Sequence, residues 1–186
     1  MAEFTIEQML RTGHVKRWQI VRTAREQTIA EHMYRVWVIS KFILGAINSP
    51  SLLGIITLEW ALMHDVPEVV TGDIATPAKA AMRAAVPEGD PIRTIELSLS
   101  DEYRMLWENS KKHWMEGYPT PYEIVKLADL TEAYAFITCE GIGHHGRAVM
   151  QGAFSAMYAQ LDVMRNKYQT IDWMEVASLM DRSAKT

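Results

Sequence analysis

TIAEHMYRVWVISKFILGAI, residues 28–47, carries a helical pattern of apolar residues that indicates the class of the whole fold. It opens with Thr28 and Glu31 at the spacing of a capping box, in which the Thr hydroxyl accepts a backbone N–H and the Glu side chain reaches back. The residues of one face then recur at helical spacing: Ile29, Met33, Val36, Ser40, Ile43, Leu44 and Ile47. This pattern predicts one long helix with a buried side, ending before Asn48-Ser49-Pro50 because proline crowds the preceding turn.

Helix signals continue through the rest of the chain. A second helix is predicted over 52–65, one from Thr120 to about Cys139, and one over 146–167. Further helix starts are marked by capping residues, mostly followed by proline: Thr76-Pro77, Asp90-Pro91, Thr120-Pro121 with Glu123, and Asp172 with Glu175. No convincing run alternates apolar and polar residues with hairpin turns. The predicted class is therefore all-α, a compact helical bundle.

The composition predicts a single globular domain, residues 1–186. Apolar residues make up 48% and charged residues 23%, which excludes a disordered chain. We find no internal repeat and no linker rich in Gly, Ser or Pro that would divide the chain. A lone cysteine, Cys139, excludes an internal disulfide and fits a reducing cytosol.

The charge and hydropathy of the chain argue against two kinds of partner, membranes and nucleic acids. The first residues lack a signal peptide's basic and apolar regions, and the apolar run 36–47 is too short to span a bilayer. A net charge of −4 argues against a nucleic-acid binder, which normally carries a basic excess. We therefore expect a cytoplasmic protein that binds neither membrane nor nucleic acid.

Three predicted helices carry residues that bind metals. His32 lies in the first long helix, His64-Asp65 ends the next, and Asp129 lies in the helix that Thr120 caps. Neutral imidazoles together with carboxylates suit Zn, Mn, Fe or Co better than an all-oxygen Mg cage. Such ligands can converge in the core of a bundle, and an octahedral ion would leave two positions for water and substrate.

None of these residues is a strong signal alone. A single helical His is usually structural, and a His-Asp pair or a carboxylate such as Glu68 at a helix start is common. Asp129 is more telling, because it lies among Ile124, Val125, Leu127, Ala128 and Leu130, where an unpaired carboxylate is costly to bury. The combination of three elements therefore favours a metal site.

The order His32, His64-Asp65, Asp129 resembles the HD-domain phosphohydrolases. Arg17-Trp18, the block 64–69, the block 71–79 and 126–129 extend the resemblance over about residues 14–137. The set looks like the small 5′-deoxynucleotidases of this superfamily, and within them most like the phage dATP triphosphohydrolases. The HD enzymes that hydrolyse guanosine tetraphosphate usually carry a second acidic residue directly after the Glu of the His-Asp-x-x-Glu motif. This chain has Val69 at that position, which argues against that branch.

The resemblance implies a role for each residue of these blocks. One divalent ion (Zn, Co, Mn or Mg, with a transition metal favoured) would be held by His32, His64, Asp65 and Asp129. Glu68 would be the general acid/base beside the attacking water. The implied substrate contacts are Arg17, Lys79 and Lys126 to phosphate, Trp18 to sugar or base, Asp73 to the sugar hydroxyl, and Ile20 to the adenine, where it crowds a 2-amino group.

Each of these residues also has an ordinary structural explanation. Trp18 and Ile20 could be core residues, Asp73 a turn residue after Gly72, and the lysines solvated. The loop from Gly141 to Arg147, with His144-His145, matches no motif and is read as a glycine-rich surface loop.

The leading hypothesis is a homo-oligomeric, metal-dependent hydrolase that splits dATP into deoxyadenosine and triphosphate, in the host cytoplasm if phage-encoded. The alternative within the fold is a 5′-deoxynucleotidase acting on deoxynucleoside monophosphates. A third hypothesis is a non-catalytic nucleotide-binding module, which the presence of Glu68 disfavours because binding alone needs no general base.

Overall fold

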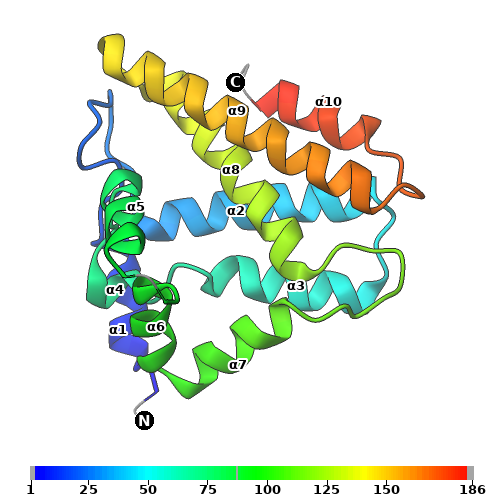
Figure 1. Cartoon of the computed structure of the whole chain (residues 1–186), viewed down its shortest axis with the longest axis horizontal. Helices are drawn as coiled ribbons and strands as arrows, with labels where there is room; N and C mark the ends of the chain where they lie inside the picture. Colours follow the sequence, from blue (N-terminus) through cyan, green and yellow to red (C-terminus); the bar gives the residue numbers. More distant parts are fainter. Residues whose placement is uncertain (1–2, 87, 184–186) are drawn as a thin grey trace.

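The computed structural model describes residues 3–86 and 88–183, and helices form its regular structure (Figure 1). The helices are α1 (Ile6–Leu10), the 3₁₀ helix η1 (Arg11–Gly13), α2 (Ile29–Ala46), α3 (Ser51–Met63), α4 (Glu68–Thr71), α5 (Thr76–Ala85), α6 (Pro91–Ser98), α7 (Asp101–Ser110), α8 (Pro121–Glu140), α9 (Gly143–Lys167) and α10 (Met174–Ser183). Within the described residues there is no β-strand, only two isolated bridges. The predicted all-α class is confirmed.

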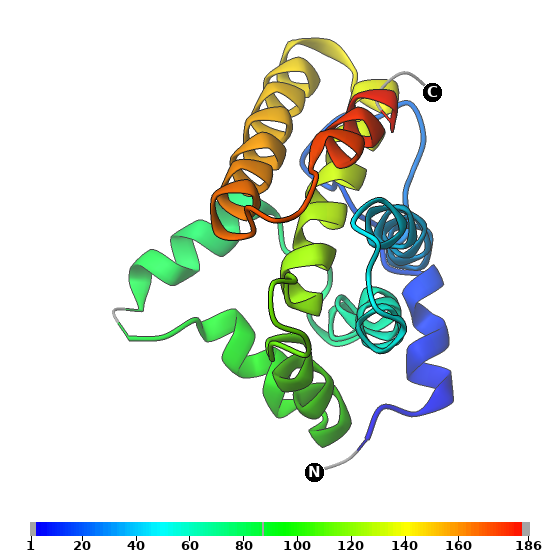
Figure 2. The same ribbon diagram turned by 90° about the vertical axis from the view of Figure 1, so that its right-hand side faces the viewer.

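Helix α8 runs through the middle of the bundle (Figure 2). It packs against α2, α3 and α9, and its buried face includes Ile124, Leu127 and Phe136. Apolar side chains of α2, α3 and α9 complete the core, since burying apolar area contributes roughly 25 cal/mol per Å². The three helices that carry the predicted metal ligands, α2, α3 and α8, are therefore mutual neighbours.

The start of α8 is held by the predicted capping box. The Thr120 hydroxyl accepts from the Glu123 backbone N–H at 3.2 Å, and the Glu123 carboxylate accepts from the Thr120 N–H at 2.8 Å. Glu123 also accepts from Lys167 and Tyr168 at the end of α9, at 2.6 Å each. One carboxylate thus caps the central helix and joins it to its neighbour.

Several predicted helix boundaries are corrected by the structure. Thr28 caps α2, but Glu31 pairs with Arg25 at 2.7 Å, so only half of that capping box forms. Thr76 is the first residue of α5 rather than its cap, which is Ala75 without a side-chain bond. Helix α3 ends at Met63, two residues before the predicted end at Asp65.

The segment 141–147 is also corrected, because α9 begins at Gly143 and so includes His144 and His145 in its first turn. Gly141 and Gly146 lie so close that a Cβ on Gly146 would meet the Gly141 carbonyl carbon at 2.9 Å. A side chain at Gly146 would therefore push the two helices apart.

The loop 14–28, which carries Arg17, Trp18 and Ile20, is tied to this same turn. The Ala24 N–H donates to the Glu140 carbonyl at 2.8 Å, and the Ile142 N–H donates to the Arg22 carbonyl at 2.9 Å. The loop is closed on itself by the Arg17 N–H, which donates to the Gln27 carbonyl at 2.9 Å. These bonds fix the loop across the end of α8, next to α2.

No helix in the described part of the chain combines the length and apolar character needed to cross a bilayer.

Two Thr-Pro sites allow a matched test of this fold. We expect Thr120→Ala to lower the free energy of unfolding by about 1 kcal/mol, the usual cost of losing an N-cap hydroxyl. Thr76→Ala should leave it nearly unchanged, because Thr76 is exposed and caps nothing. Urea unfolding of both variants measures the difference, and equal losses would contradict the cap assignments.

Candidate active site

The predicted metal ligands come together where α2, α3 and α8 meet. His32 projects from α2, His64 is the C-cap of α3, and Asp65 follows it in the turn before α4. One ligand atom from each of these three residues lies within 4.8 Å of the others. Asp129 of α8 joins them, with its Oδ1 3.4 Å from the His32 Nε2.

The two imidazoles aim the same nitrogen at the cluster. The His32 Nε2 lies 3.4 Å from the Asp65 Oδ2, and the His64 Nε2 lies 3.5 Å from the same oxygen. Both Nε2 atoms are buried, and neither has a hydrogen-bond partner among the described residues. Such orphaned nitrogens beside two carboxylates fit a divalent cation, because each would otherwise lose its hydration without compensation.

The other ring nitrogen of each His is held by the protein. The His64 Nδ1 donates to the Ala61 carbonyl at 2.9 Å, and the His32 Nδ1 donates to the Glu132 carboxylate at 2.7 Å. A hydrogen bond at Nδ1 selects the tautomer that leaves Nε2 free for a metal. These two hydrogen bonds therefore orient both imidazole rings with Nε2 toward the carboxylates of the cluster.

Electrostatics at the cluster reflect its buried charges. Burial and the Arg17 charge lower the pKa of His32, but the carboxylates of Asp129, Asp65 and Glu132 outweigh them and raise this pKa to about 10, so a divalent ion at Nε2 would displace a proton from the ring. Burial lowers the pKa of His64, so its ring is neutral. Burial raises the pKa of Asp129, yet Lys126 and His32 hold it well below its usual value. The carboxylates are thus ionised, as metal ligands must be.

Glu68 begins the short helix α4 next to this cluster. Only 4% of its side chain is exposed, and its Oε1 accepts from the Lys79 ammonium at 3.1 Å. Its Oε2 is buried and has no partner among the described residues. Burial and the Asp65 charge raise the pKa of Glu68 to about 8, against the opposing effect of Lys79.

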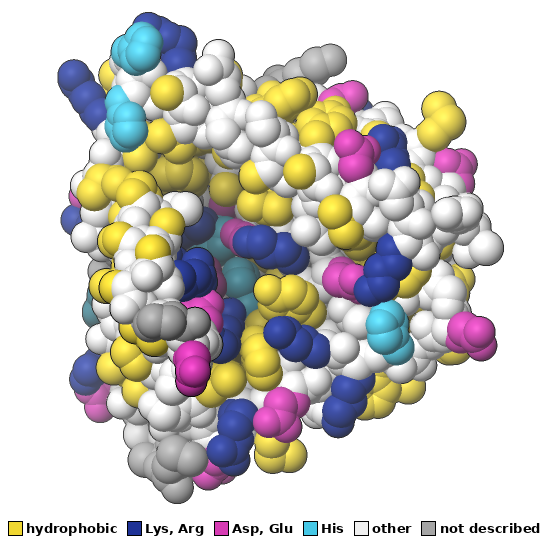
Figure 3. Space-filling model, viewed as in Figure 1, with side chains coloured by type: hydrophobic (Ala, Val, Ile, Leu, Met, Phe, Trp, Pro, Cys, Tyr) yellow, Lys and Arg dark blue, Asp and Glu magenta, His cyan; other side chains and the backbone are white. Residues whose placement is uncertain are grey.

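The predicted basic residues are placed around the ligands. The Lys126 ammonium lies 3.0 Å from the Asp129 Oδ2, one turn earlier on the same face of α8, as predicted. Lys79 on α5 pairs with Glu68, and the Arg17 guanidinium contacts the His32 ring and lies 3.4 Å from Glu132. Figure 3 shows a recess between α5 and α8 where Lys and Arg side chains surround acidic and His side chains.

The residues predicted to contact the nucleoside are Trp18, Ile20 and Asp73, and they lie around the cluster rather than in it. Trp18 has a positive φ of 63°, stacks on Phe136 with 5.7 Å between ring centroids, and donates from Nε1 to Gln27 at 2.8 Å. Ile20 is 56% exposed, so it is not a core residue. Asp73 is half-buried after Gly72, and its charge acts on both Glu68 and Lys79.

One buried acid at this site was not found by sequence reasoning. Glu132 on α8 is fully buried and contacts His32, Arg17 and Gln27. It lies three residues after Asp129 in the same apolar stretch, so the argument that singled out Asp129 applies to it as well. It was missed because it belongs to none of the blocks that carry the family resemblance.

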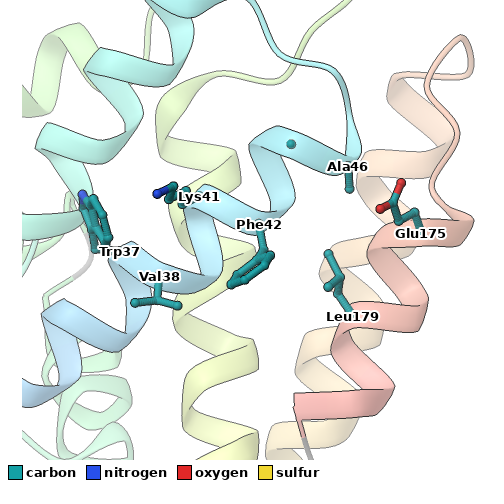
Figure 4. A pocket seen from close by; sticks show the side chains of 8 residues that line it. Trp37, Val38, Lys41, Phe42, Ala46, Glu175 and Leu179 are labelled. Carbon is teal, nitrogen blue, oxygen red and sulfur yellow. The ribbon is translucent and has the colours of Figure 1, made fainter.

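Two other features lie outside the cluster. His144 and His145 are exposed and belong to no group of potential ligands within the described residues. A shallow hollow of about 390 Å³ lies between α2 and α10 (Figure 4). It is mostly apolar and is lined by Trp37, Val38, Lys41, Phe42, Gly45, Ala46, Glu175 and Leu179.

Comparison with known proteins agrees with this geometry. The chain is 32% identical to a dATP triphosphohydrolase of cyanophage S-2L, over 82% of this chain and 80% of that protein. It is 30% identical to a 5′-deoxynucleotidase of Klebsiella pneumoniae, over 64% of each chain. The solved cyanophage S-2L HD phosphohydrolase DatZ, bound to dA and one catalytic Zn²⁺ ion, matches with a TM-score of 0.80 and 29% identity, covering 99% of both chains.

A family model described as 5′-deoxynucleotidase YfbR-like matches residues 5–176, which include every residue of the cluster. The fold, the convergent His and Asp side chains and this match agree with one another. The chain therefore belongs to the YfbR-like 5′-deoxynucleotidase family of HD phosphohydrolases.

Proposed function

We propose that this metal-dependent deoxynucleotide phosphohydrolase cleaves dATP between the sugar oxygen and the first phosphorus, giving deoxyadenosine and intact triphosphate. The observation that carries the proposal is the convergence of His32, His64 and Asp65 with Asp129, beside the buried Glu68. The dATP triphosphohydrolases among its relatives, from three phages, support this choice of substrate.

The four ligands would hold one divalent ion, Zn²⁺, Co²⁺, Mn²⁺ or Mg²⁺, with a transition metal favoured by the two imidazoles. The Zn²⁺ ion in DatZ supports this assignment. When bound, such an ion draws electron density from the phosphate nearest the sugar and lowers the pKa of a nearby water.

Glu68 would act as the general acid/base. Its Oε2 is buried, has no partner in the described residues, and lies on the turn that follows the ligand pair His64-Asp65. A carboxyl whose pKa is raised toward neutrality can take a proton from the attacking water and return it to the sugar oxygen that leaves. The Lys79 ammonium, 3.1 Å from Oε1, stabilises the ionised form of Glu68.

The basic residues and the loop 14–28 would bind the substrate. Lys126, Lys79 and Arg17 carry the charge that a polyphosphate requires, and the planar guanidinium suits phosphate oxygens. Trp18 and the exposed Ile20 would contact the base, and Asp73 would accept from the sugar hydroxyl. The pinned loop fixes Trp18 relative to α8 and so limits where a base can stack.

We further propose a single domain over residues 1–186, a homo-oligomeric state, a cytoplasmic location (the host cytoplasm if the gene is a phage gene) and no nucleic-acid partner. Exposed large apolar side chains on α2 and α3, among them Tyr34, Phe42 and Ile55, support the oligomer. Sedimentation velocity tests it, and a monomer at micromolar concentration would contradict it.

A product assay tests the reaction directly. We expect dATP with added Co²⁺, Mn²⁺, Mg²⁺ or Zn²⁺ to yield deoxyadenosine and tripolyphosphate, with dAMP turned over no faster, and chelation to abolish the activity. Rapid phosphate release from dAMP with dATP untouched would instead assign the chain to the monophosphate branch. Full activity after chelation would contradict the metal mechanism.

Two substitutions separate the metal ligands from the acid/base. We expect Asp129→Ala to lose both metal and turnover, and Glu68→Ala to keep the metal while turnover falls by at least about 100-fold, the usual contribution of a general acid/base. Metal content by mass spectrometry and dATP turnover are measured together. Equal metal loss in both variants would show that Glu68 is a ligand.

Ile20 tests the base preference. If its side chain crowds a 2-amino group, Ile20→Ala should raise kcat/KM for dGTP relative to dATP by about 10-fold, the scale of a small steric change in a pocket. The control is Ile95→Ala, an isoleucine of similar exposure on α6. An unchanged ratio in Ile20→Ala would remove this residue from the base pocket.

A further inference from the structure

Glu132 occupies a position where only a carboxylate satisfies every neighbour. It is fully buried on α8, one turn beyond Asp129. Its Oε2 accepts from the His32 Nδ1 at 2.7 Å and lies 3.4 Å from the Arg17 guanidinium. Its Oε1 accepts from the Gln27 amide at 2.7 Å and lies 3.2 Å from the Arg35 Nε. All four neighbours are donors, so both ends of the side chain must accept.

The charge balance explains how this acid tolerates burial. The Glu132 carboxylate is fully buried, and four donors lie within 3.4 Å of its two oxygens. A buried carboxylate is stable only when it is paired and fully hydrogen-bonded. Two guanidiniums, the His32 ring N–H and the Gln27 amide meet that condition and hold the Glu132 carboxylate in place.

We propose that Glu132 is the positioning residue for the metal ligand His32. Its carboxylate accepts the proton on the His32 Nδ1, a nitrogen that the Arg17 Nη1 also contacts, and so fixes the ring orientation with Nε2 directed at Asp65 and Asp129. A negative partner at Nδ1 also makes the imidazole a stronger donor to a metal. The inference rests on the proposed metal site, but it is independent of which deoxynucleotide is cleaved.

The same carboxylate connects the ligand to the nucleoside loop. Trp18 donates to the Gln27 side-chain oxygen at 2.8 Å, and the Gln27 amide donates to Glu132. A continuous chain of hydrogen bonds thus runs from the Trp18 indole to the His32 ring. Glu132 therefore positions His32 relative to the loop that would carry the base.

Metal affinity tests the proposal without any need for turnover. In Glu132→Gln, an amide N–H must face a donor at one end, and the negative charge at Nδ1 is gone. We expect Zn²⁺ and Co²⁺ dissociation constants, measured by chelator competition, to rise by about 10- to 100-fold, the usual effect of losing such a partner. The matched control is Glu140→Gln, two turns later on α8, whose carboxylate pairs with Arg25 at 3.0 Å.

The control should keep its metal affinity within about twofold of the parent protein. Thermal melting in EDTA separates stability from affinity, because a purely structural Glu132 would lower the melting temperature and leave the affinity of the folded protein unchanged. That result, or a Glu132→Gln affinity within about twofold of the parent, would overturn the proposal.

A measurement on the unmodified protein decides the matter if Glu132→Gln does not fold. Nitrogen-15 NMR of the Zn²⁺-loaded, histidine-labelled protein reports the tautomer of His32. A proton on Nδ1 with the metal on Nε2 supports the proposal, and a metal on Nδ1 overturns it. Protein that binds Zn²⁺ in this way but leaves dATP intact would reject the proposed substrate and leave the role of Glu132 standing.

Discussion

The structure depends on the burial of charge where α2 crosses α8. His32, Asp129 and Glu132 come from these two helices, and two of the three are completely buried. Charged groups in a low-dielectric core are stable only when each has a partner at bonding distance. This constraint fixes the rotation of both helices about their axes, because turning either one would leave a buried carboxylate or imidazole unpaired. The apolar packing around this crossing stabilises the folded state, while the buried charged groups determine how α2 and α8 are rotated against each other.

The loop 14–28 and the turn 140–146 follow from the same constraint. Arg17 and Gln27 supply donors to the buried carboxylate of α8, so the loop must lie against that helix. Backbone bonds to Glu140 and Ile142 then hold its far side, and Gly146 allows the close approach of α9 that this turn requires. The loop is thus placed by a network centred on Glu132, which also contacts His32. The loop 14–28 and the His–Asp cluster therefore share one set of buried hydrogen bonds.

On the opposite side of the cluster, Glu68 and Lys79 bring α4 and α5 to the recess. Helix α5 buries none of its residues in the described structure, so its link to the site is carried by charge more than by apolar packing. The ion pair between Lys79 of α5 and Glu68 of α4, at 3.1 Å, is the contact that joins these two helices at the recess.

The all-α class and the α8 capping box could be predicted from the sequence, because both depend on local spacing. The meeting of His32, His64, Asp65 and Asp129 was expected from their combination on three helices and from the family resemblance. The predicted starts of α5 and α9 were wrong: Thr76 is the first residue of α5 and not its cap, and α9 begins at Gly143. The predicted capping box at Thr28 forms only in part, because Glu31 pairs with Arg25 instead of reaching back to Thr28. The partners of Glu132 depend on the tertiary fold, because its donors lie about 100 residues away in sequence, on α2 and on the loop before it. Spacing within one helix specifies which residues share a face, but the partner that each buried charge meets is set by how the helices cross.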